Sequence, residues 1–120
     1  MKFTKFVPSI FYADIRSGLK LFVDCLEFTI AHDELTADCP FCVVDKDGLS
    51  VMLFQNKEYA AKDNPEFRLV TNNIEEVYER VKSKFPELLH PNLSEVTVRP
   101  WGAKEFAMVD GQIGIRVQQW

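Results

Sequence analysis

Apolar and polar positions in the first half of the chain predict four strands and one helix. Residues 3–13 are rich in aromatic and β-branched side chains, which is typical of a strand. Asp14 is a plausible helix N-cap, and from Ile15 onward apolar residues recur at helical spacing as far as Leu26. Residues 33–38 are interpreted as an acidic loop. Further strands are predicted at residues 28–32, 41–44 and 49–54, the last two joined by a turn at 45–48.

The second half repeats this order of elements after a polar stretch without periodicity, residues 56–65, which is interpreted as a linker. Residues 67–71 predict a strand, Asn73 a helix cap, and residues 74–85 a helix that Pro86 ends. Three strands are predicted to complete the chain, at residues 95–99, 104–109 and 112–119. The last of them alternates apolar and polar side chains, as expected of a strand with one buried face.

An internal repeat therefore relates the two halves, although few residues are identical between them. Asp14-Ile15 corresponds to Asn73-Ile74, and apolar residues follow both pairs at the same spacing. The pattern predicts an α+β fold of two βαβββ modules, about residues 1–55 and 66–120, within a single domain. The sheets should be mainly antiparallel, with a helix on one face of each. The other faces must then be buried against each other or around a ligand.

A corner and a hairpin stand out near the end of the chain. Asp110-Gly111 between two strand patterns is a strong hairpin signal. Just before it, proline fixes φ and glycine permits a turn on either side of Trp101, so the indole should lie at a bend.

Composition excludes several classes of protein. The net charge of −4 comes without any basic stripe, so nucleic-acid binding has no support. No apolar run approaches the roughly 18 residues that cross a membrane. Three cysteines without a secretory signal indicate reduced thiols. A soluble cytoplasmic protein is expected.

The segment Pro100-Trp101-Gly102-Ala103-Lys104-Glu105-Phe106, followed closely by Asp110-Gly111, resembles the Pro-Trp-Gly-x-x-Glu-Phe segment of bleomycin-resistance proteins. These form a branch of the vicinal oxygen chelate superfamily, which also includes glyoxalase I and extradiol dioxygenases. Residues 10–28 resemble the first strand and helix of that branch. Two departures are Glu27, where the family has glycine, and a final turn shorter than the usual Asp-Pro-Asp-Gly. The resemblance covers nearly the whole chain and implies sheets curved around a cavity.

In the metalloenzymes of that superfamily, the resemblance implies two histidine and two glutamate ligands on the first, fourth, fifth and eighth strands. The corresponding positions here fall near Val7, Glu66, Leu53 or Phe54, and Ile115. At most one of these side chains offers a donor to a divalent metal. The sequence therefore predicts no metal and no cofactor. A glyoxalase-like or dioxygenase-like enzyme with altered ligands is the alternative.

Bleomycin-resistance proteins, by the same resemblance, are homodimers whose interface grooves sequester a flat, cationic drug without chemical conversion. Aromatic rings would stack on the ligand and carboxylates would face its positive charge. The candidate ligand-binding residues are Trp101, Phe41, Phe54, Phe106, Asp33, Asp38 and Glu105. The resemblance thus predicts a small-molecule ligand, for example an antibiotic of the bleomycin type. It also predicts a homodimer, whose modules pair either within one chain or by domain swapping.

Each candidate also has a plainer interpretation. Phe54 and Phe106 could simply belong to the hydrophobic core, and Trp101 could cover one end of a sheet. Glu105 could form an ion pair with a cross-strand lysine or arginine on the solvent face. The acidic side chains of the 33–38 loop could simply be solvated.

Two other motifs have both a functional and a plainer interpretation. Cys39 and Cys42 have the spacing of a redox pair, but strand and turn residues follow them rather than a helix, which favours free thiols. His32 and His90 lie in no metal-like or catalytic constellation, which favours a loop or strand-end position over a ligand or base.

Overall fold

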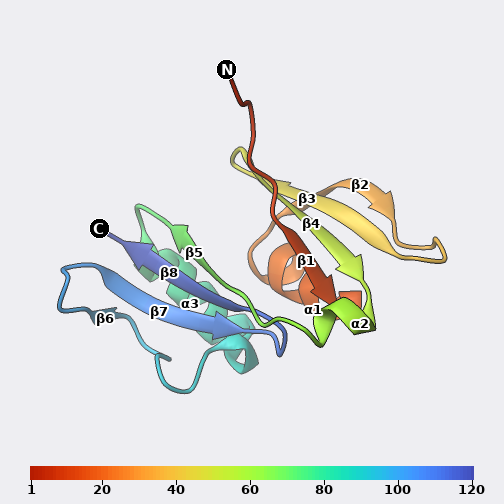
Figure 1. Cartoon of the computed structure of the whole chain (residues 1–120). Coiled ribbons are helices and arrows are strands. Elements are labelled where there is room, and N and C mark those ends of the chain that lie inside the picture. The colour runs from red at the N-terminus through yellow and green to blue at the C-terminus, as the bar shows by residue number, and fades with distance from the viewer. The chain divides into compact units, whose positions relative to one another are not determined.

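The chain builds the same arrangement twice, a four-stranded sheet with a helix on one face (Figure 1). The computed structural model describes residues 1–120, which divide into two units, Met1–Asp63 and Asn64–Trp120. The α+β class expected from the sequence is confirmed. None of the helices is both long and apolar enough to span a bilayer.

In the first unit the sheet has the strand order β1-β4-β3-β2. β1 runs parallel to β4, and the other pairs are antiparallel. The elements are β1 (Ser9–Tyr12), α1 (Ile15–Leu19), the π-helical turn η1 (Lys20–Cys25), β2 (Thr29–Glu34), β3 (Phe41–Lys46), β4 (Leu49–Gln55) and α2 (Lys57–Ala60).

In the second unit the order is β5-β8-β7-β6, with β5 parallel to β8 and the other pairs antiparallel. The hairpin expected at Asp110-Gly111 joins β7 and β8. The elements are β5 (Glu66–Val70), α3 (Ile74–Lys84), the 3-10 turn η2 (Pro86–Leu88), β6 (Thr97–Val98), β7 (Lys104–Val109) and β8 (Gly114–Gln119).

Both main helices begin on the same pair of contacts. Asp14 caps α1 and Asn73 caps α3 through their side-chain oxygens, as expected. In addition, Oε1 of a glutamine at the end of the unit's last strand accepts a hydrogen bond from the first helical N–H. Gln55 accepts from Ile15 N at 3.1 Å, and Gln119 accepts from Ile74 N at 2.8 Å. The repeat thus extends from the sequence pattern to the bonds that fix each helix on its sheet.

Several elements differ from the sequence prediction, most of them by one or two residues at a boundary; the strand predicted at 95–99 shortens to Thr97–Val98. The first strand begins only at Ser9, because Pro8 has no N–H to donate and offers the sheet only its carbonyl. β2 extends through Glu34 into the expected acidic loop. The expected linker contains α2, which starts where the Asn56 side chain accepts from Tyr59 N. The first helix widens to a π-turn after Leu19 and ends at Cys25, with Leu26 as its C-cap. Glu27 follows the cap with a φ of 64°, in the left-handed region that favours glycine.

Gly18 lies at a close contact between α1 and its sheet. A Cβ added there would lie 2.5 Å from Cε2 of Tyr12, whose ring is 1% exposed. The glycine weakens the helix intrinsically, but it lets the buried ring of β1 pack directly against the helix backbone.

We predict that Gly18→Ala lowers the free energy of unfolding. The methyl group displaces a buried ring, which costs about 1–3 kcal/mol and outweighs the gain of about 1 kcal/mol in helix propensity. Urea unfolding followed by far-UV circular dichroism measures the change. Ser17→Ala on the same helix is the control and should shift stability by no more than about 0.5 kcal/mol. A Gly18→Ala protein as stable as the parent would contradict this account of the contact.

Candidate functional site

Three phenylalanines lie side by side on the face of the first sheet that α1 does not cover. Phe54 on β4 is in register with Phe11 on β1 and with Phe41 on β3. Side chains alternate between faces along a strand, and the neighbours Ile10 and Tyr12 are buried on the helix side. The three phenylalanines therefore project from the opposite face, where each is partly exposed.

These rings form the centre of a longer aromatic row. Phe11 and Phe54 stack with centroids 5.2 Å apart and planes at 23°, and Phe54 and Phe41 follow at 5.8 Å and 24°. Tyr59 of α2 meets Phe11 edge-on at 5.1 Å, and His32 of β2 lies 5.7 Å from Phe41. We call these five side chains the aromatic row. Partly exposed aromatic rings of this kind are suited to contact with a flat apolar group.

The corresponding face of the second sheet carries charge instead. Glu105 on β7 is fully buried, with 0% exposure. Its Oε2 accepts from Nε2 of Gln118 at 2.6 Å and from Nε1 of Trp101 at 3.0 Å. Its Oε1 accepts from Nη1 of Arg116 at 3.3 Å and lies 3.9 Å from Nε of Arg99. A buried carboxylate is thus held by four partners, two of them cationic.

These partners decide the charge of Glu105. Burial raises the pKa of this carboxyl, but the hydrogen bonds from Gln118, Trp101 and Arg116 and the positive charge of Arg116 lower it by more. The net pKa is below the ordinary value of 4.5, so the group is ionised at neutral pH.

Trp101 lies in the turn between β6 and β7, at the expected bend. Its side chain is 51% exposed, and its ring covers the guanidinium of Arg99 at 4.9 Å. Together with the hydrogen bond to Glu105, this places the indole as a cover over the charged cluster.

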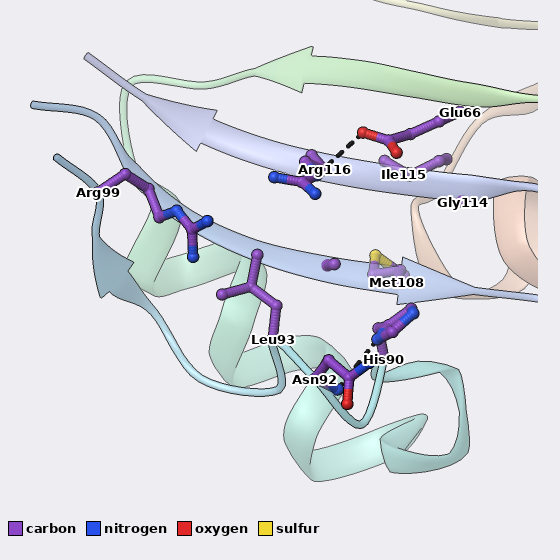
Figure 2. A pocket seen from close by; sticks show the side chains of 10 residues that line it. Glu66, His90, Asn92, Leu93, Arg99, Met108, Gly114, Ile115 and Arg116 are labelled. Carbon is purple, nitrogen blue, oxygen red and sulfur yellow. Dashed lines mark hydrogen bonds and ion pairs between the residues drawn. The ribbon is translucent and has the colours of Figure 1, made fainter. Parts of the chain in front are cut away.

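A pocket of about 410 Å³ lies on the second unit (Figure 2). Its lining combines charged, polar and apolar side chains with two small residues. They are Glu66, His90, Asn92, Leu93, Arg99, Ala107, Met108, Gly114, Ile115 and Arg116.

The structure brings only some of the candidate residues into one place. Phe41 and Phe54 belong to the aromatic row. Phe106 is fully buried and meets Tyr78 of α3 at 5.2 Å, so it lies in the core on the helix side of its sheet. Trp101 and Glu105 contact each other in the second unit.

The remaining acidic candidates lie away from the aromatic row or in a loop. Asp33 is in register with the buried Cys42, which directs its side chain to the face opposite Phe41. Asp38 is exposed in the segment between β2 and β3. Glu105 pairs with the cross-strand Arg116, one of the alternatives considered for it, although it is buried rather than solvent-facing.

Sequence reasoning missed Phe11, Tyr59, Arg99 and Arg116. Phe11 lies in the continuous apolar run Ile10-Phe11-Tyr12, which does not separate the two faces of the strand. Arg116 carried a usable signal, because it alternates with apolar neighbours on a strand and so belongs to the other face. Tyr59 carried none, because it lies in a short helix within a stretch that has no periodicity.

The positions that correspond to metal ligands in related enzymes do not fit a divalent ion. Val7 precedes β1, and Leu53 and Ile115 are buried apolar side chains. Glu66 is the one donor, and Nε of Arg116 already lies 2.9 Å from its Oε1. No three histidine, cysteine, aspartate or glutamate side chains come together as a metal site in residues 1–120.

The thiols also lack the environment of a redox pair. Cys25, Cys39 and Cys42 form no disulfide, and only Cys39 is exposed. Burial, with a smaller contribution from the charge of Asp33, raises the pKa of Cys42. A raised pKa disfavours the reactive thiolate.

Neither family models nor curated protein sequences match the chain. Solved structures do. A bleomycin-binding protein in complex with bleomycin is 19% identical, with a TM-score of 0.73 over 97% of this chain and 98% of that chain. The bleomycin-binding protein of Streptomyces verticillus, with copper(II)-bleomycin, is 18% identical, with a TM-score of 0.70 over 98% and 96%. A superfamily member from Sphaerobacter thermophilus is 16% identical, with a TM-score of 0.71 over 100% and 98%.

At these identities the likeness establishes the fold. The chain has the fold of the glyoxalase/bleomycin resistance/dioxygenase superfamily, as the Pro-Trp-Gly segment and the repeat indicated. The structures that it resembles include bleomycin-binding proteins.

We predict that Glu105→Gln lowers the free energy of unfolding of the second unit by about 1.5–3 kcal/mol at neutral pH, because it removes the charge from the buried hydrogen bonds with Gln118, Trp101 and Arg116. Arg116 keeps its ion pair with Glu66, which limits the loss. Urea unfolding followed by tryptophan fluorescence measures this, since Trp101 and Trp120 both lie in that unit. Glu75→Gln, at an exposed position on α3, is the control and should change stability little.

The stability of the parent protein and that of Glu105→Gln should depend differently on pH. Because the folded pKa of Glu105 is depressed, its stabilising effect is complete above the ordinary pKa of 4.5 and is lost as pH falls through the folded pKa. The difference in stability between the parent and Glu105→Gln should therefore shrink in acid. A difference that stayed constant as pH fell would contradict the ionised network.

Proposed function

We propose that this protein binds a small molecule with a flat aromatic group on the aromatic row of the first unit and holds it without chemical conversion. The observation that carries the proposal is the row itself, in which three partly exposed rings stack at similar inclinations across adjacent strands. A planar antibiotic of the bleomycin type is the first candidate, because proteins of the same fold have been solved with bleomycin bound.

Stacking and apolar contact supply the binding free energy in this proposal. Aromatic pairs contribute about 0.5–1.5 kcal/mol each beyond the area that they bury, and the row offers several rings to one ligand. The rings are carried by neighbouring strands in fixed register, so they lose little freedom when a ligand arrives.

Charge plays a smaller part than the resemblance suggested. The carboxylate of Glu105 is already matched by Arg116 and Gln118, and Asp33 faces the helix side of its sheet. The proposal therefore rests on a flat ligand, and a positive charge on that ligand is not required. A homodimer with grooves at the subunit interface stays a prediction from the resemblance.

Titration calorimetry with bleomycin and with simpler planar aromatics tests the proposal. Phe54→Leu keeps apolar volume but removes the central ring, and should weaken binding of the best ligand about fivefold, the equivalent of about 1 kcal/mol. Replacing Phe11, Phe41 and Phe54 together by leucine should weaken it much further.

Phe6→Leu is the matched control. Phe6 is an exposed phenylalanine of the same unit outside the row, so its loss should leave affinity unchanged. The proposal fails if no planar compound binds, or if Phe6→Leu and Phe54→Leu weaken binding equally.

A further inference from the structure

We propose that the pocket of the second unit binds the carboxylate of a small organic acid, through Arg99 and Arg116. We call it the arginine pocket. It is built from different residues and a different unit than the aromatic row, so this inference does not depend on the proposed function.

The hollow exists because its floor is made of small residues. Ala107 on β7 is in register with Arg116 on β8, and Gly114 on β8 is in register with Glu66 on β5. All four side-chain positions therefore share the face opposite Phe106 and α3. A Cβ at Gly114 would lie 3.8 Å from Cγ of Glu66 and 3.9 Å from O of Met108, at ordinary van der Waals contact, so the glycine leaves room for about one small group there.

One wall of the pocket is the segment that follows η2. It is fixed to the free edge of β7 by two backbone hydrogen bonds, His90 N to Ala107 O and Ala107 N to Leu93 O, each 2.9 Å. Nδ1 of His90 accepts from Asn92 N at 3.0 Å (Figure 2). In the neutral ring the proton is then on Nε2, which makes this nitrogen a donor. His90 thus adds a hydrogen-bond donor to the wall and no negative charge.

Arg116 and Arg99 differ in how many carboxylates accept hydrogen bonds from them. Arg116 bonds Glu66 at 2.9 Å through Nε and Glu105 at 3.3 Å through Nη1. Arg99 reaches Glu105 only at 3.9 Å, and its buried Nε has no hydrogen-bond partner. An unmet buried donor costs about 1–3 kcal/mol. A bound anion would supply the missing acceptor.

The guanidinium of Arg99 is also fixed in orientation before an anion binds. The ring of Trp101 lies against its guanidinium at 4.9 Å, and Trp101 is in turn tied to Glu105. A guanidinium whose plane is fixed loses little entropy on forming the paired hydrogen bonds that match a carboxylate.

The lining favours an organic acid over a bare ion. Leu93 and Ala107 give the pocket apolar side chains next to the arginines. Met108 and Ile115 alternate with the residues of this face, so they border the pocket while their side chains are buried on the helix side. Its volume of about 410 Å³ is within the range of sites for small organic ligands. A molecule with one carboxylate and a compact apolar body fits both features.

Benzoate is the probe. Its binding is measured from changes in amide chemical shifts in NMR spectra of the full chain. We expect saturable shifts at Ala107 and Gly114. Arg99→Gln should weaken binding about tenfold, as the loss of one charge-assisted hydrogen bond does. Gly114→Val should abolish it by filling the hollow, and its far-UV circular dichroism should match the parent.

Arg68→Gln is the matched control. Arg68 lies on the same sheet face and also pairs with Glu66, at 3.5 Å, but it does not line the pocket. It should leave benzoate affinity unchanged, and so should Phe54→Leu, which separates this site from the aromatic row.

Three results would overturn the proposal. The first is no saturable shift at Ala107 or Gly114 up to roughly 50 mM benzoate, where a millimolar site would be filled. The second is an equal loss in Arg68→Gln and Arg99→Gln, which indicates diffuse attraction to surface charge. The third is tighter binding of inorganic phosphate than of benzoate, which removes the assignment to a carboxylate.

Discussion

Each sheet of this protein has two faces, and its own unit supplies a main helix for only one of them. α1 and η1 cover one side of the first sheet, and α3 covers one side of the second. Side chains that alternate along the strands must therefore divide into a buried set and a set that meets something else. The composition of that second set is what gives each unit its chemistry.

The two units resolve this constraint differently. The first places partly exposed rings on its uncovered face, where they stack on one another and expose apolar surface. The second places a buried carboxylate there, which pairs with the charge of Arg116 and accepts hydrogen bonds from Gln118 and Trp101, while Arg99 is left with an unmet donor. A common backbone repeat thus carries an aromatic surface in one copy and a polar pocket in the other.

The sequence predicted the repeat, the two helix caps and the last hairpin because each depends on local chemistry. A side-chain oxygen at Asp14 or Asn73 and the turn at Asp110-Gly111 act within a few residues. Phe41 and Phe54 were also candidates, although only cross-strand register joins them to Phe11 in one row.

Other features depend on contacts between strands that a sequence pattern does not specify. Period-two alternation separates two faces of a strand but does not say which one the helix covers, so Phe106 was a candidate ligand contact and is in the core. The bond of Arg116 to Glu105 likewise needs the register of β7 against β8.

The central claim is that the uncovered face of the first sheet is a ligand surface. Intermolecular nuclear Overhauser effects between a bound planar ligand, bleomycin first, and the ring protons of Phe11, Phe41 and Phe54 test it most directly. The account predicts contacts from the ligand's aromatic protons to all three rings. A saturated complex whose contacts fell on other residues, with none to this row, would contradict it.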